Sequence, residues 1–69
     1  MTLDEAKAAC LEEVPVRHRV HDVFYARIMG LLYEPNGHGG FYCSCVCADS
    51  MSPISTTRCN PGDLEVIGK

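Results

Sequence analysis

The sequence predicts an α+β fold that is mostly β, with an N-terminal helix and four or five antiparallel strands. Residues 2–13 are rich in helix formers and carry apolar side chains at helical spacing. The rest of the chain alternates β-branched and aromatic stretches with turn-forming residues. A small sheet must protect its edges, and a strongly bent strand lets a small barrel close. We therefore expect an SH3-like small barrel or a strongly curved sheet.

Length and composition indicate one globular domain over residues 1–69. The chain has 69 residues, of which 46% are hydrophobic and 22% are charged, and this balance is typical of a folded protein rather than a disordered or coiled-coil one. A chain of this length buries only about 60% of the surface that its unfolded form exposes. We therefore expect a thin core.

The helix is predicted at about residues 2–13. Thr2 and Glu5 stand at the spacing of a capping box, in which each side chain accepts a hydrogen bond from the backbone amide of the other residue. Pro15 disfavours helical geometry at the residue before it and so ends the helix. Because about three turns of helix are marginal in isolation, this helix must dock on the sheet.

The predicted strands span about 15–21, 23–33, 41–48, 54–59 and 64–67. The first alternates polar and apolar side chains, and Val16, His18 and Val20 share its apolar face. In the long second strand, Gly30 is where we expect a bulge or a strong bend. Asn36-Gly37 is the strongest hairpin signal in the chain and predicts the turn between the second and third strands.

The net charge of −3 lies on the N-terminal segment, because the acidic and basic residues after position 13 balance. Only Arg17, Arg19 and Arg27 form a local basic stretch, so a nucleic acid is not the expected partner. No apolar run approaches the roughly 18 residues that a membrane span needs, and the acidic start does not look like a signal peptide. We expect a cytoplasmic protein with reduced thiols and no membrane partner.

Five cysteines are present, and three of them alternate along one predicted strand. Cys43, Cys45 and Cys47 therefore point to one face of that strand, together with Phe41. The first interpretation is that all four side chains face the core, because a free cysteine behaves as a small apolar residue.

Two other interpretations of the cysteines stay open. One is a zinc site, which would combine one or two of the three strand cysteines with Cys59, His38 or Cys10. The other is a cross-strand disulfide between one of the three and Cys59, which leaves a thiol over because the number of cysteines is odd.

No arrangement of residues suited to catalysis stands out. The sequence has no C-x-x-C motif, no spacing that singles out a cysteine–histidine pair, and no glycine-rich loop that leads from a strand into a helix. His18 and His21 are three residues apart on a predicted strand, so we expect them on opposite faces. The sequence therefore predicts a protein that is not an enzyme and holds no cofactor.

The surface that we expect to bind a partner combines the basic stretch with the nearby tyrosines, since tyrosines line the peptide grooves of SH3-type domains. Its residues are Arg17, Arg19, Arg27, Tyr25, Tyr33 and Tyr42. If the arginines lie on different faces and no aromatic side chain is exposed beside them, this surface is not a site.

Short sequence features along most of the chain carry a family resemblance. They are Thr2-Leu3-Asp4-Glu5-Ala6, Pro15-Val16, Tyr25-Ala26-Arg27-Ile28, Tyr33, Tyr42, Asp49 and Pro61-Gly62-Asp63-Leu64-Glu65. On these features the chain resembles short uncharacterised proteins of prophages and other mobile elements of Gram-positive bacteria. The cysteine-rich strand and the Gly-His-Gly-Gly loop depart from that group. The resemblance implies a genomic context and a compact fold, with no assigned activity.

The leading hypothesis is a small accessory or interaction module that acts by contact with an unidentified protein, as a monomer or a weak homodimer. Two alternatives remain. One is a weak nucleic-acid-binding small barrel, and the other is a structural zinc protein that uses Cys43, Cys45, Cys47 or Cys59.

Overall fold

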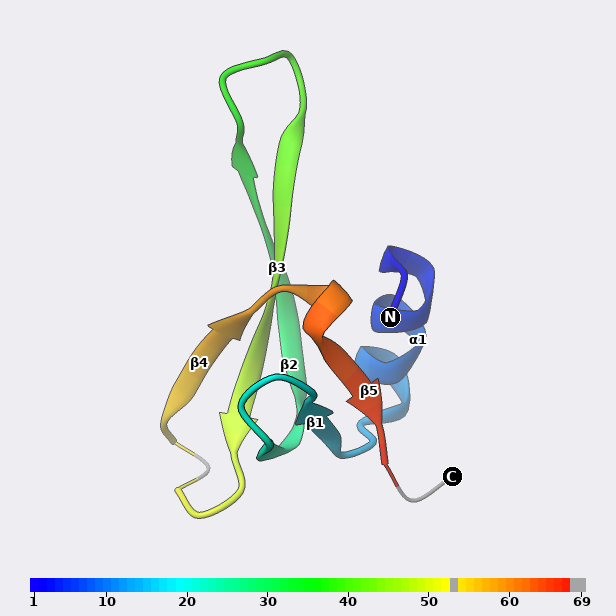
Figure 1. The fold of residues 1–69 in the computed structure, drawn as a ribbon, viewed down its shortest axis with the longest axis vertical. Helices are drawn as coiled ribbons and strands as arrows, with labels where there is room; N and C mark the ends of the chain where they lie inside the picture. Colours follow the sequence, from blue (N-terminus) through cyan, green and yellow to red (C-terminus); the bar gives the residue numbers. More distant parts are fainter. Residues whose placement is uncertain (53, 68–69) are drawn as a thin grey trace.

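The computed structural model of the chain describes residues 1–52 and 54–67. Its elements are α1 (Leu3–Glu12), β1 (Val16–His18), β2 (Val23–Pro35), β3 (Phe41–Asp49), β4 (Thr56–Cys59), a 3-10 turn η1 (Pro61–Asp63) and β5 (Leu64–Val66). The five strands form a single antiparallel sheet in the order β4-β3-β2-β1-β5 (Figure 1). The predicted fold class is confirmed. Of its two forms, the curved sheet is observed, because β4 and β5 are the two edges of an open sheet.

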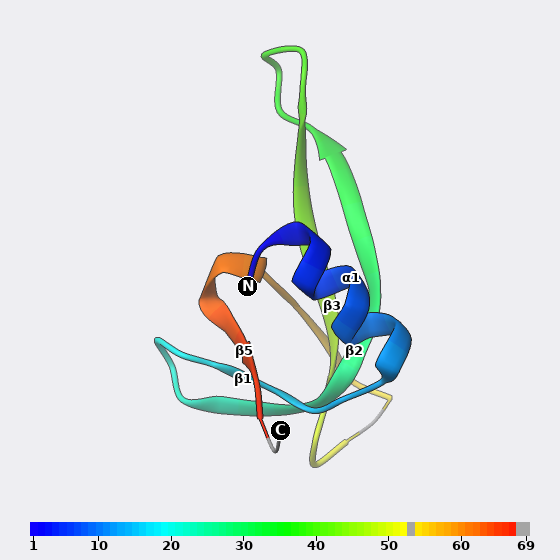
Figure 2. The same cartoon turned by 90° about the vertical axis from the view of Figure 1, so that its right-hand side faces the viewer.

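The helix begins at the predicted capping box. The Glu5 amide donates to the Thr2 hydroxyl at 3.2 Å, and the Thr2 amide donates to the Glu5 carboxylate at 2.9 Å. The second of these bonds lowers the pKa of Glu5, because it favours the ionised carboxylate. The helix ends at Glu12, and Glu13 caps it with a left-handed backbone of φ 55°. Figure 2 shows α1 lying against β2.

Two register shifts in the β2–β3 ladder interrupt β2, one between Tyr25 and Arg27 and the other between Ile28 and Gly30. The second confirms the irregularity predicted at Gly30, and the first was not predicted. A bulge inserts an extra residue and reverses the alternation of side chains beyond it. Tyr25 and Ile28 are three residues apart and yet both lie in the core, with exposed fractions of 6% and 0%.

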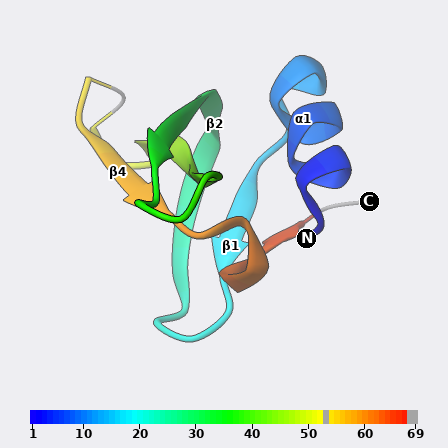
Figure 3. The ribbon, with the colours of Figure 1, turned by 90° about the horizontal axis from the view of Figure 1, so that it is seen from above.

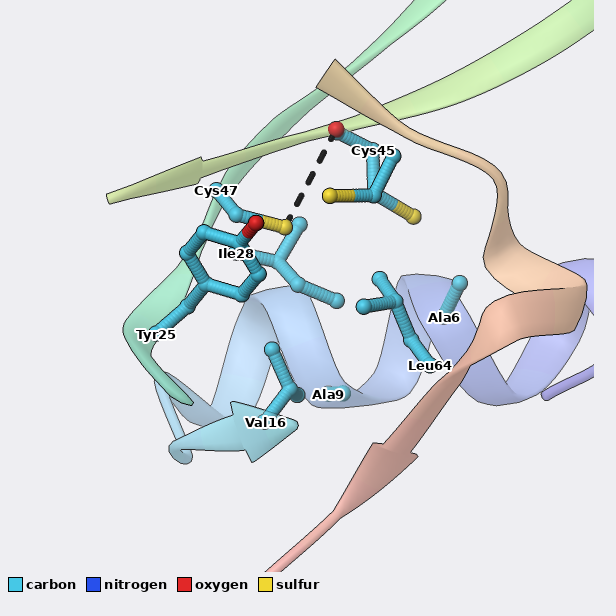
Figure 4. Close-up of a cluster of buried hydrophobic side chains, with 9 residues drawn as sticks. Ala6, Ala9, Val16, Tyr25, Ile28, Cys45, Cys47 and Leu64 are labelled. Atoms are coloured by element: carbon cyan, nitrogen blue, oxygen red, sulfur yellow. Dashed lines mark hydrogen bonds between the residues drawn. The ribbon is translucent and has the colours of Figure 1, made fainter. Parts of the chain in front are cut away.

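The core lies between α1 and the inner face of the curved sheet. Figure 4 shows side chains from the helix and from several strands converging there. Its buried members are Ala6, Ala9, Val16, Tyr25, Ile28, Cys45, Cys47, Cys59 and Leu64. The helix contributes only two alanines to this set, and such small side chains let a helix lie close to a sheet. Figure 3 shows that α1 and β4 lie on opposite sides of β2.

Three strands are shorter than predicted, and β1 differs most. It ends at His18 because the Asp22 amide donates to the His18 carbonyl at 2.8 Å and closes a turn, in which Asp22 has φ 54°. Val20 was expected on the inner face but is exposed in this turn. β4 starts at Thr56, two residues later than predicted, and β5 ends at Val66, one residue earlier.

β2 and β3 continue beyond the rest of the sheet as a two-stranded ribbon. β1 pairs with β2 only over residues 23–25, and β4 pairs with β3 only over residues 45–48. Figures 1 and 2 show the ribbon projecting from the body of the molecule. At its tip Asn36 bonds to the backbone of Gly40, and Gly37 and Gly39 take the positive φ values that the tight turn needs.

Replacing Ile28 with alanine tests the bend in β2. The side chain is fully buried, so its removal is expected to lower the free energy of unfolding by about 2–5 kcal/mol through lost burial and a residual cavity. Met29→Ala is the matched control, because the neighbouring Met29 is exposed and its change should cost only about 0.5 kcal/mol. Urea denaturation followed by circular dichroism measures both. Equal losses of unfolding free energy in the two variants would contradict the inward direction of Ile28 and the outward direction of Met29.

Candidate functional site

The three arginines of the predicted surface each have their own partner. Arg17 sits between two buried residues of β1, so its side chain points away from the core. There its guanidinium donates to Glu65 at 2.9 Å and to Asp22 at 2.8 Å. The hydrogen bond to Glu65 is the main cause that raises the pKa of Arg17. Arg17 is thus held in a network of opposite charges.

Arg19 and Arg27 lie in different surroundings. The Arg19 guanidinium donates to the carbonyl of Gly62 at 2.6 Å, beside η1. The Arg27 guanidinium lies 3.7 Å from the carboxylate of Glu13, at the end of the helix. Each arginine is therefore held by a different acceptor of the same chain, Arg17 and Arg19 beside β5 and η1 and Arg27 at the end of the helix.

Tyr25 was predicted to be part of the binding surface, but it is in the core. Its side chain is 6% exposed, because the first bulge in β2 directs it inward. Burial raises the pKa of Tyr25 to about 12, with a further contribution from contact with the Cys59 thiol. Tyr25 is a structural residue in the described fold.

Tyr33 and Tyr42 lie on the projecting ribbon and are exposed, as the sequence predicted for surface residues. Leu32 and Phe41 are exposed beside them. We refer to Leu32, Tyr33, Phe41 and Tyr42 as the hairpin surface. Phe41 was expected in the core with the strand cysteines. It is instead 67% exposed, because its part of β3 lies beyond the helix and the other strands.

The hairpin surface presents apolar side chains on both faces of the ribbon. Tyr33 is the register partner of Cys43, so it lies on the face that Phe41 shares with the cysteines. Leu32 is the partner of Ser44, so it lies on the opposite face with Tyr42. An exposed aromatic side chain is therefore available to a partner on either side.

The ribbon carries little charge. No lysine or arginine occurs between residues 28 and 57 of the sequence. The carboxylate of Glu34 accepts a hydrogen bond from Arg58 at 2.7 Å, so its charge is paired. Among the described residues, β3 has no strand partner over 41–44 on the side away from β2. The ribbon thus offers apolar side chains and a strand edge with unpaired backbone groups.

The cysteines lie in two environments. Cys45 and Cys47 are fully buried, which confirms the core interpretation for both, and Cys59 is buried beside them. Cys43 and Cys10 are half-buried, and all five are free thiols. His38 lies in the exposed turn of the hairpin. Within residues 1–52 and 54–67, no group of three or more histidine, cysteine or acidic side chains is placed to hold a metal ion.

His18 and His21 lie together, contrary to the prediction that they face opposite ways. Their ring centroids are 4.6 Å apart, and the His21 amide donates to Nδ1 of His18 at 3.2 Å. The cause is the early end of β1, after which the turn at Asp22 brings His21 back over the strand. His18 is buried and lies 3.8 Å from the carboxylate of Asp63.

No protein-family model, curated protein or solved structure matches the chain. In the part of the chain that the structure describes, no helix is long and apolar enough to cross a membrane.

The burial of Tyr25 predicts that one of the three tyrosines ionises at about pH 12. The folded protein holds this proton more tightly than the unfolded chain, whose tyrosine pKa is near 10. The resulting stability is fully present below about pH 10 and is lost as the pH rises towards 12. Tyrosinate absorbance is followed against pH while circular dichroism shows an intact fold. The ionisation step at the highest pH should be absent in Tyr25→Phe and present in Tyr33→Phe. Persistence of that step in Tyr25→Phe would contradict the burial of the hydroxyl.

Proposed function

We propose that this protein is a small non-enzymatic accessory module that binds another protein through the hairpin surface. The observation that supports this proposal is the projecting ribbon, which exposes two large apolar side chains on each of its faces. Contiguous exposed apolar patches on small folded proteins mark interaction sites. Aromatic residues are also enriched in protein interfaces and carry much of the binding energy there.

The stability of the ribbon supports the same proposal. An isolated two-stranded hairpin is at best marginally stable in water. Beyond Leu31 the ribbon has neither the helix nor a third strand beside it. A partner that covers Phe41 or Tyr42 would remove apolar surface from water, which is worth about 25 cal/mol per Å². Binding would therefore stabilise the segment that the rest of the fold supports least.

The chemistry of the ribbon favours a protein partner over a nucleic acid. Phosphate neutralisation by lysine and arginine supplies most nucleic-acid affinity, and the ribbon has neither residue. The arginines Arg17, Arg27 and Arg58 all lie beside carboxylates of the same chain. An apolar, weakly charged surface suits contact with another protein. The resemblance to short prophage and mobile-element proteins fits an accessory role inside a bacterial cytoplasm.

Alanine variants of the ribbon test this function. Affinity purification with the tagged chain from its source cells identifies candidate partners, and calorimetry with each purified candidate measures the dissociation constant. Phe41→Ala or Tyr42→Ala is expected to raise the dissociation constant by about tenfold or more, the usual effect of removing an interface aromatic. Both variants should fold normally, because both side chains are largely exposed.

Phe24→Ala is the matched control for this experiment. Phe24 is an exposed aromatic residue of β2, 49% accessible, but it stands at the start of the strand, away from the ribbon. Its replacement is expected to leave the affinity unchanged. The proposed surface would be contradicted if both hairpin variants bound the partner as tightly as the unmodified chain. Loss of binding in Phe24→Ala alone would contradict it too.

A further inference from the structure

Cys45 and Cys59 are direct partners across the β3–β4 ladder. Their side chains are 0% and 6% exposed, and both thiols are free. Directly opposite residues in an antiparallel pair place their side chains on the same face of the sheet. The two side chains therefore point into the core from the same face of the sheet, one from β3 and the other from the edge strand β4.

The backbone geometry at this position suits a disulfide. The Asp49 amide donates to the Ser55 carbonyl at 2.9 Å, just beyond the ladder, and so marks a hydrogen-bonded position, although the Ser55 amide itself donates to Ser52 at 2.8 Å. Hydrogen-bonded pairs recur at every second position, so Cys45 and Cys59 form one as well, with Cα atoms about 5.5 Å apart. Disulfides join Cα atoms about 4.4–6.8 Å apart and Cβ atoms about 3.5–4.5 Å apart, so the Cα separation fits and a small approach of the two Cβ atoms completes the bridge.

The other cysteines are less well placed. The Cys47 thiol contacts Cys59, but Cys47 pairs with Thr57 and is only a diagonal neighbour of Cys59. Diagonal neighbours have Cα atoms about 7–8 Å apart, beyond the range of an unstrained disulfide. Cys43 lies two residues past the last β3–β4 pair.

We propose that Cys45 and Cys59 are a site of reversible oxidation, at which a small-molecule disulfide such as oxidised glutathione converts the two thiols to a cross-strand disulfide. One protein thiolate attacks the oxidant, forms a mixed disulfide and releases one molecule of reduced glutathione. The second protein thiolate then attacks the protein sulfur of the mixed disulfide and releases the second molecule. The protein loses two electrons and two protons, and the sulfur–sulfur bond of the oxidant is reduced to two thiols.

The position of β4 gives the oxidant a route to the buried thiols. β4 has four residues, is an edge of the sheet and ends at Cys59. Short edge strands open locally more readily than central ones. Burial raises the pKa of Cys45 to about 11, so the thiol is protonated in the closed fold and reacts slowly. Opening of β4 is therefore the step that admits the oxidant.

The bridge would fasten β4 to β3 and would constrain the unfolded chain. It closes a loop of about 15 residues, for which the loss of unfolded-state entropy predicts a rise in the melting temperature of about 10–20 °C. The oxidised protein should thus be the more thermostable form, and dithiothreitol should reverse the change.

Peptide mapping identifies the bridge directly. The reduced protein is equilibrated with glutathione buffers of increasing oxidised fraction, and remaining thiols are alkylated before trypsin digestion. Cleavage after Arg27 and Arg58 separates residues 28–58, which contain Cys43, Cys45 and Cys47, from residues 59–69, which contain only Cys59. The expected product joins these two peptides, and its fragment ions place the bond at Cys45. This readout needs no variant, so it does not depend on whether a cysteine replacement folds.

Two variants provide the matched comparison. Cys47→Ala should keep the linked peptides and the rise in melting temperature, whereas Cys45→Ala should lose both. Fragment ions that place the bond at Cys47, or a link that survives in Cys45→Ala, would overturn the assignment. So would the absence of any link between the two peptides when dilute urea loosens β4 in the presence of oxidised glutathione.

Discussion

The bend of β2 at its two bulges is the constraint on which the rest of the structure depends. Each bulge reverses the alternation of side chains, so Tyr25 and Ile28 both face inward although they are three residues apart. The bend also lets one strand pair with β1 at its start and with β3 over most of its length. The sheet thereby curves around a space that α1 fills with two alanines, Ala6 and Ala9. A chain of 69 residues has apolar surface for one thin core, and this bend encloses it.

The same strand divides the molecule into two regions with different roles. Up to Ile28, β2 belongs to the core and is covered by the helix. Beyond Leu31 it continues with β3 as a ribbon that carries the hairpin surface away from the body. The buried thiols of Cys45 and Cys59 stand where the body ends, at the last pair between β3 and β4. The proposed binding surface and the proposed oxidation site thus lie on one strand, β3, in adjacent segments.

Local patterns in the sequence were sufficient for the elements that depend on local chemistry. The capping box at Thr2, the bulge at Gly30 and the burial of Cys45 and Cys47 were all predicted in this way. Alternation along a strand assigns faces, but it does not tell where the strand leaves the core. Phe41 was therefore placed in the core, although no neighbouring strand or helix covers it. Tyr25 was placed on the surface because nothing in the residues around it signals the first bulge.

Native-state hydrogen exchange along β2 and β3 tests whether one continuous pair of strands is core at one end and projecting ribbon at the other. Hydrogen-bonded amides in residues 32–34 and 42–44 are expected to exchange at least about tenfold faster than those near Ile28 and Cys47, a difference of about 1.4 kcal/mol in opening free energy. The ribbon can open without disturbing the core. Equal protection along the full length of both strands would contradict this division.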